Sequence, residues 1–120
     1  MTSGPVERIS AVTLHTADMR RAVAFYEALG FEVLYGGADE AFTSFAVGTG
    51  FLNLQLVEAG TSQPVWGRVI FYVDDVDAMH ERVTGAGYRA MTLPTDAPWG
   101  ERYFHVHDPD GHELSFARPL

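Results

Sequence analysis

Two segments of this chain carry the same pattern of residues, one in each half of the sequence. Residues 11–31 read AVTLHTADMRRAVAFYEALGF, and residues 68–88 read RVIFYVDDVDAMHERVTGAGY. When the first segment is moved by 57 residues, Asp18 falls on Asp75 and Gly30 falls on Gly87 without a gap. A fixed period close to half the chain length indicates an internal structural repeat. We therefore expect two similar folding units in sequence.

Each repeated segment reads as a strand followed by a helix. A run rich in β-branched and apolar residues predicts the strand, and the aspartate after it is placed to cap a helix. Apolar residues then recur at helical spacing, and a glycine follows where a helix commonly ends. The pattern predicts helices over residues 19–29 and 76–86, and strands over residues 9–16, 31–35, 42–47, 51–58, 68–73, 88–92, 102–107 and 113–117.

The predicted fold class is α+β, with a strand–helix–three-strand unit in each half. We expect one domain over residues 1–120, because this length is typical of a single core. Within it, residues 8–58 form the first module, residues 59–67 a linker, and residues 68–118 the second module. Residues 93–101 form a loop where the two modules differ most and where the extra residues of the second module belong, and insertions on a repeated scaffold are where function tends to lie.

Composition excludes several kinds of function. The chain has no cysteine, which rules out disulfides, thiolate metal sites and a cysteine nucleophile. Its N-terminus has no apolar core and no run approaches the length of a membrane span, so we expect a cytoplasmic protein without a membrane partner. The net charge of −8 argues against a nucleic-acid partner. It is compatible with a cationic ligand, or simply with solubility.

Three separated motifs resemble the vicinal oxygen chelate superfamily. They are DMRRAVAFYEALGF at residues 18–31, VDDVDAMHERVTGAGY at residues 73–88, and DPDGHELSF at residues 108–116. The superfamily includes glyoxalase I, fosfomycin-resistance thiol transferases, extradiol dioxygenases and bleomycin-resistance proteins. The resemblance implies paired βαβββ modules whose exposed sheet faces form a cup, usually completed in a homodimer.

The resemblance also implies where a metal would be bound. Metal-dependent members carry four ligands, and the corresponding positions here are Ala11, Gln55, Arg68 and Ser115. Alanine has no donor atom, and a fixed guanidinium repels a divalent cation. Glutamine alone is a weak neutral ligand. We therefore expect no metal or other cofactor.

Arg68 and two histidines are the first candidate site residues. Arg68 is expected on the cup face, where it anchors an anionic group or pairs with Glu58, Glu101 or Glu113. His105 and His107 share a strand face, opposite Ser115. They form either a two-histidine metal site or part of the cup wall. His15 is expected at the rim, and His80 and His112 in solvent.

Trp99 is the second candidate, because a PWG loop before the penultimate strand resembles the bleomycin-resistance proteins. Its indole suits a planar ligand group, although packing at a dimer seam is an alternative. Trp66, in the linker, is a candidate for either role, ligand stacking or packing at the dimer seam. The expected ligand-binding set is Arg68, Trp99, His105, Tyr103, Gln55, Ser115, Tyr72, Asn53 and Phe51, with Phe45 as a further cup-wall candidate.

Three functions are compatible with these residues. The leading hypothesis is a metal-free, homodimeric binding protein of the bleomycin-resistance type, which sequesters a small molecule or antibiotic and is not an enzyme. The alternative is a metal-dependent lyase, thiol transferase or dioxygenase with a non-standard site built from His105, His107 and a carboxylate. The third is a dimeric interaction module whose cup is filled by its own side chains.

Overall fold

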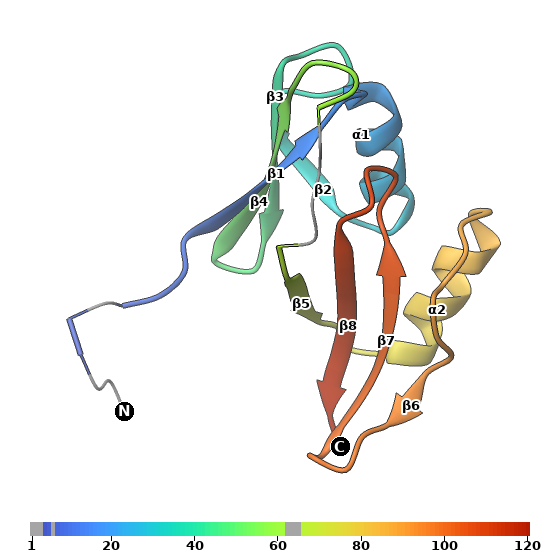
Figure 1. Cartoon of the computed structure of the whole chain (residues 1–120). Coiled ribbons are helices and arrows are strands. Elements are labelled where there is room, and N and C mark those ends of the chain that lie inside the picture. Colours follow the sequence, from blue (N-terminus) through green and yellow to red (C-terminus); the bar gives the residue numbers. More distant parts are fainter. Residues whose placement is uncertain (1–3, 6, 62–65) are drawn as a thin grey trace.

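Two four-stranded mixed sheets and two helices make up the described part of the chain (Figure 1). The structure, a computed structural model, describes residues 4–5, 7–61 and 66–120. The first sheet has the order β1-β4-β3-β2 and the second has the order β5-β8-β7-β6. In each sheet the first and last strands of the repeat are parallel neighbours. The elements are β1 (Ala11–Thr16), α1 (Met19–Ala28), β2 (Glu32–Tyr35), β3 (Phe42–Val47), β4 (Gly50–Leu56), β5 (Arg68–Tyr72), α2 (Val76–Gly85), β6 (Thr95–Asp96), β7 (Glu101–His107) and β8 (Glu113–Pro119). The α+β class and the paired βαβββ topology are confirmed.

The helices begin and end where the repeat predicts. The side chain of Asp18 accepts a hydrogen bond from the backbone N–H of Arg21 at 3.0 Å, and Asp75 does the same for Ala78 at 3.0 Å. Each bond satisfies an amide that the first helical turn leaves without a partner. Gly30 and Gly87 follow the helices with φ of 99° and 91°, where a side chain would be strained.

Strand alternation separates a closed face from an open face in each sheet. The closed faces supply buried apolar side chains, including Leu14, Leu52, Leu54, Phe45, Phe71, Phe104, Val106, Leu114 and Phe116. Because successive side chains point to opposite sides of a strand, the residues between them lie on the open faces. Phe45 is fully buried against Tyr26, so its assignment to the cup wall is wrong.

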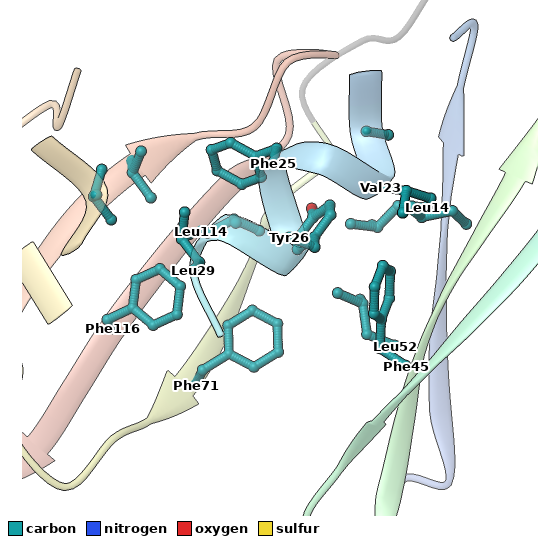
Figure 2. Packing of buried hydrophobic residues seen from close by; sticks show 14 of the residues in the cluster. Leu14, Val23, Phe25, Tyr26, Leu29, Phe45, Leu52, Phe71, Leu114 and Phe116 are labelled. Carbon is teal, nitrogen blue, oxygen red and sulfur yellow. The ribbon is translucent and has the colours of Figure 1, made fainter. Parts of the chain in front are cut away.

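One hydrophobic core joins the two halves of the chain. Figure 2 shows α1 between the two sheets, with Phe45 and Leu52 on one side and Phe71 and Phe116 on the other. Phe31 extends the packing toward the second sheet, because its ring centroid lies 5.1 Å from that of Phe71 and the two rings meet edge to face. Such pairs add to the free energy gained from burial. Neither helix in the described parts of the chain is long and apolar enough to cross a membrane.

The predicted strand over residues 88–92 does not form. Only an isolated bridge joins Ala90 to Val106, because the hydroxyl of Thr92 accepts the His105 N–H that a continuing strand would have used. Within the predicted loop, β6 pairs with β7 instead. The remaining strands and helices agree with the predicted ranges to within two residues.

Candidate functional site

Six of the nine predicted binding residues lie together on or beside the open face of the second sheet. The register places Ile70 beside Ser115 and Ser115 beside His105, and in the next row Tyr72 beside Ala117 and Ala117 beside Tyr103. Trp99 comes from the turn that precedes β7. We call this group, with the two glutamates that bind it, the second-sheet cluster: Arg68, Tyr72, Trp99, Glu101, Tyr103, His105, Glu113 and Ser115.

Arg68 is held by two partners within the cluster. Its Nη2 lies 2.6 Å from Oε2 of Glu113, and its Nη1 lies 3.2 Å from Nε2 of His105. A guanidinium only donates hydrogen bonds, so Nε2 of His105 is the acceptor and the ring proton is on Nδ1. Nδ1 then donates to Oγ of Ser115 at 2.6 Å. Of the three glutamates considered as partners, Glu113 is the one that pairs with Arg68.

This arrangement keeps His105 neutral. Burial and then the Arg68 guanidinium lower the pKa of the imidazole, while Glu113 opposes them. The direction of the bond to Ser115 also matters for chemistry, because a general base must accept the proton of its nucleophile. Here His105 donates to Ser115, so the pair is not arranged as a serine–histidine catalytic dyad.

Trp99 and Tyr103 form a second part of the cluster, which we call the aromatic shelf. Their rings are stacked, with centroids 5.6 Å apart and planes inclined by 28°. The indole Nε1 donates to Oε1 of Glu101 at 3.0 Å, and the hydroxyl of Tyr72 donates to the other oxygen. Both hydrogen bonds lower the pKa of Glu101, the one from Tyr72 more than the one from Trp99, and so favour the carboxylate form. Trp99 is 67% exposed, so the shelf is open to a ligand.

The other three predicted residues lie on β4, in the first sheet. Asn53 donates to the hydroxyl of Thr13 at 3.2 Å, and Gln55 donates to the carbonyl of Ala41 at 3.2 Å, so both are bonded within their own half of the chain. Phe51 instead lines a cavity of about 540 Å³, together with residues of β1, β4 and β5 and with Trp66. Arg68 also lines this cavity. The cavity and the second-sheet cluster therefore meet at Arg68, with the aromatic shelf outside the cavity lining.

The positions that hold a metal elsewhere in the superfamily do not suit one here. Ala11 has no donor, Ser115 already accepts from His105, and Arg68 places a cation at the site. Among residues 4–5, 7–61 and 66–120, no group of three histidine, aspartate or glutamate side chains is arranged to hold a metal ion. The donor set therefore does not fit a divalent ion, and we derive no reaction step through one.

Two histidines lie elsewhere than the sequence predicted. His112 is buried rather than solvated. Its Nδ1 accepts from Nε1 of Trp66 at 3.1 Å, and its Nε2 donates to the carbonyl of His15 at 2.8 Å. His80 is half-buried, with its ring edge-on to Phe104 at 5.2 Å. Both depend on packing between elements distant in sequence, so the local pattern held no signal for either.

Glu101 is a site residue that sequence reasoning did not assign to the shelf. It was considered only as a partner for Arg68. Its position two residues before Tyr103 places both on one face of β7, and this spacing was a readable signal.

Residues 8–116 match the sequence profile of the Glyoxalase/Bleomycin resistance protein/Dioxygenase superfamily. The chain belongs to this superfamily. Among sequence relatives of this superfamily member, an uncharacterized protein of Mycobacterium bovis is 44% identical over 48 residues, which is 40% of this chain and 32% of that protein. The matched part thus spans about a third of the curated relative's length.

Several solved structures share the fold. TioX from Micromonospora sp. ML1 is 30% identical with a TM-score of 0.74, over 95% of this chain and 100% of that one. A lactoylglutathione lyase from Agrobacterium tumefaciens is 22% identical with a TM-score of 0.75, over 95% of both chains. A bleomycin-binding protein solved with bleomycin is 20% identical with a TM-score of 0.74, over 96% of this chain and 100% of that one. The last two likenesses concern the fold alone.

Proposed function

We propose that this protein binds and sequesters a small organic ligand without a metal ion, in the manner of the bleomycin-resistance members of its superfamily. The aromatic shelf carries the proposal. An exposed tryptophan stacked on a tyrosine offers a flat apolar surface, and Glu101 beside it supplies a negative charge. A few polar groups placed against an apolar wall are what small-molecule sites usually contain.

The charges of the second-sheet cluster favour a planar ligand that carries a positive group. Glu101 is partly exposed, and its lowered pKa favours the ionised form, whereas the positive charge of Arg68 is already met by Glu113. An anionic ligand would have to displace that carboxylate from Arg68. A cationic one would gain both the carboxylate and the aromatic faces. The net charge of −8 draws such a ligand toward the protein.

A titration series tests this proposal. Bleomycin, small planar aromatic cations and small aromatic acids are each added to purified protein, and binding is followed by thermal shift and by calorimetry. We expect the cations to bind and the acids not to bind. Trp99→Ala should weaken the cations by about 1–3 kcal/mol, the cost of losing an aromatic anchor. Glu101→Gln should weaken them while leaving the stacking surface in place.

Tyr35→Ala is the matched control for Trp99→Ala. Tyr35 is exposed to the same degree, 67%, but lies on β2, away from the second-sheet cluster. Its replacement should leave binding unchanged. The proposal fails if no compound raises the melting temperature, or if Trp99→Ala leaves every binder unaffected. A stoichiometric divalent ion in the purified protein would contradict the metal-free part of the proposal.

A further inference from the structure

We propose that Arg68 is a built-in cation which takes the place of a divalent ion and thereby excludes metals from this face of the second sheet. The proposal deepens the metal-free part of the proposed function by naming the residue responsible. It follows from the way the neighbouring side chains are arranged around the guanidinium.

Two donor groups already converge on one positive centre. The carboxylate of Glu113 lies 2.6 Å from one guanidinium nitrogen of Arg68, and the Nε2 lone pair of His105 faces another at 3.2 Å. A carboxylate oxygen and a neutral imidazole nitrogen are common ligands of first-row divalent metals. Here both are directed at a guanidinium instead.

The second nitrogen of His105 is also arranged as in a metal-binding histidine. Its Nδ1–H donates to Oγ of Ser115 at 2.6 Å, which sets the tautomer and holds the ring in place. Metal-ligating histidines almost always use their other nitrogen in this way. Ser115 therefore acts as a positioning residue for the imidazole, and not as a ligand.

The strand register explains why Arg68 reaches these groups. Arg68 is paired with Glu113 across β5 and β8, and His105 with Ser115 across β7 and β8. Glu113 and Ser115 are two residues apart on β8, so all four side chains occupy the same open face. A divalent ion between Glu113 and His105 would lie beside the fixed positive charge of Arg68, and the repulsion is strong at such short range.

The proposal predicts that removing the guanidinium creates a metal site. Co²⁺ is the probe, because its visible absorption reports coordination directly, and calorimetry gives the affinity. Arg68→His adds an imidazole beside His105 and Glu113 and so completes a two-histidine, one-carboxylate set. We expect Co²⁺ to bind this variant at least about 100-fold more tightly than the wild-type protein. Arg68→Ala, which opens space but adds no ligand, should bind more weakly than Arg68→His and still more tightly than wild type.

Three further measurements separate this role from a merely structural one. Arg68→Lys keeps the positive charge and should exclude Co²⁺ as the wild-type protein does. Methylguanidinium added to Arg68→Ala should displace Co²⁺, because it restores the missing cation. In the Arg68→His background, Glu113→Gln and His105→Phe should each abolish binding, and Ser115→Ala should weaken it by roughly 10-fold or more.

Arg118→His is the control for the added imidazole. Arg118 lies on the same strand, β8, at a position of opposite parity to Glu113 and Ser115, and so on the other side of the sheet. Circular dichroism confirms that each variant is folded before titration. The proposal is overturned if Arg68→His binds Co²⁺ no more tightly than wild type or Arg118→His, if Arg68→Lys binds as tightly as Arg68→Ala, or if binding survives the loss of His105. These outcomes are independent of the bleomycin titration, so either proposal can fail alone.

Discussion

The hydroxyl of Tyr26 donates a 2.7 Å hydrogen bond to Oδ2 of Asp108, across 82 residues of sequence. Tyr26 lies on α1 in the first half, and Asp108 begins the turn between β7 and β8 in the second half. Both side chains are buried. Burial raises the pKa of Tyr26 well above its usual value, and burial likewise raises that of Asp108. This bond therefore links the two modules inside the core they share.

Tyr26→Phe should lower the free energy of unfolding by about 1–3 kcal/mol, because it leaves a buried carboxyl oxygen without its partner. Equilibrium unfolding in urea measures the change. Tyr72→Phe is the control, since it removes a tyrosine hydroxyl whose hydrogen bond to Glu101 is exposed. We expect that variant to stay within about 0.5 kcal/mol of wild type. Equal losses in the two variants would contradict the importance of the buried link.

His105 should make the protein less stable as the pH falls. Its pKa is lowered in the folded state by burial and by Arg68. Below the usual imidazole pKa of about 6.5, the unfolded chain therefore takes up a proton that the folded chain resists. The contribution of neutral His105 to the free energy of unfolding is therefore fully present above the usual imidazole pKa. It is lost as the pH falls from that value to the lower pKa of the folded state.

Urea unfolding between pH 7.5 and pH 5 (values chosen to span the usual pKa of about 6.5) tests this dependence. His105→Gln should flatten the decline relative to wild type, because glutamine does not titrate. A decline that is as steep in His105→Gln as in wild type would show that other groups cause it.

The protein should form a homodimer. Among the described residues, no helix covers the open face of either sheet, and apolar side chains are exposed there, including Ile70 at 58% and Leu34 at 62%. Burial of such side chains against a second copy is favourable. Sedimentation equilibrium should give twice the 13.2 kDa chain mass, and Ile70→Glu should shift the protein toward monomer. Leu93→Glu, at an exposed residue outside the strands, is the control. A single 13.2 kDa species for the wild-type protein would contradict the prediction.

Two glycines with similar backbone angles should respond differently to alanine. Gly36 and Gly87 have φ of 85° and 91°, so Ala at either position costs about 1–2 kcal/mol in backbone strain. At Gly36 a Cβ would also collide with the carbonyl oxygen of Phe42, whereas the space around Gly87 is open. Gly36→Ala should therefore lose roughly 1–3 kcal/mol more than Gly87→Ala. Thermal or urea unfolding of the pair measures the difference, and equal losses would mean that the loop relaxes to accept the methyl group.

The repeat, the helix limits and the faces of most strands could be read from the sequence. These features depend on residues near one another in the chain. Asp18 caps a helix that starts beside it, and Tyr103 and His105 share a face because strands alternate. The prediction of a strand over residues 88–92 was wrong, because strand pairing depends on a neighbour that is distant in the sequence. There the Thr92 hydroxyl accepts the hydrogen bond of the His105 N–H, which a continuing strand would have used.

The repeat in the sequence determined that the chain forms two βαβββ units, and the resemblance to the superfamily implied that Ala11, Gln55, Arg68 and Ser115 stand where a metal enzyme has its ligands. The sequence named Arg68, Trp99, Tyr103 and His105 but left their partners open. Only the tertiary structure decided that Arg68 pairs with Glu113, because the choice depends on the register between β5 and β8. The burial of His112 was decided in the same way, by Trp66 and the end of β1 closing over it. Local preferences are set by a few neighbouring residues, whereas these contacts exist only after distant segments have packed together.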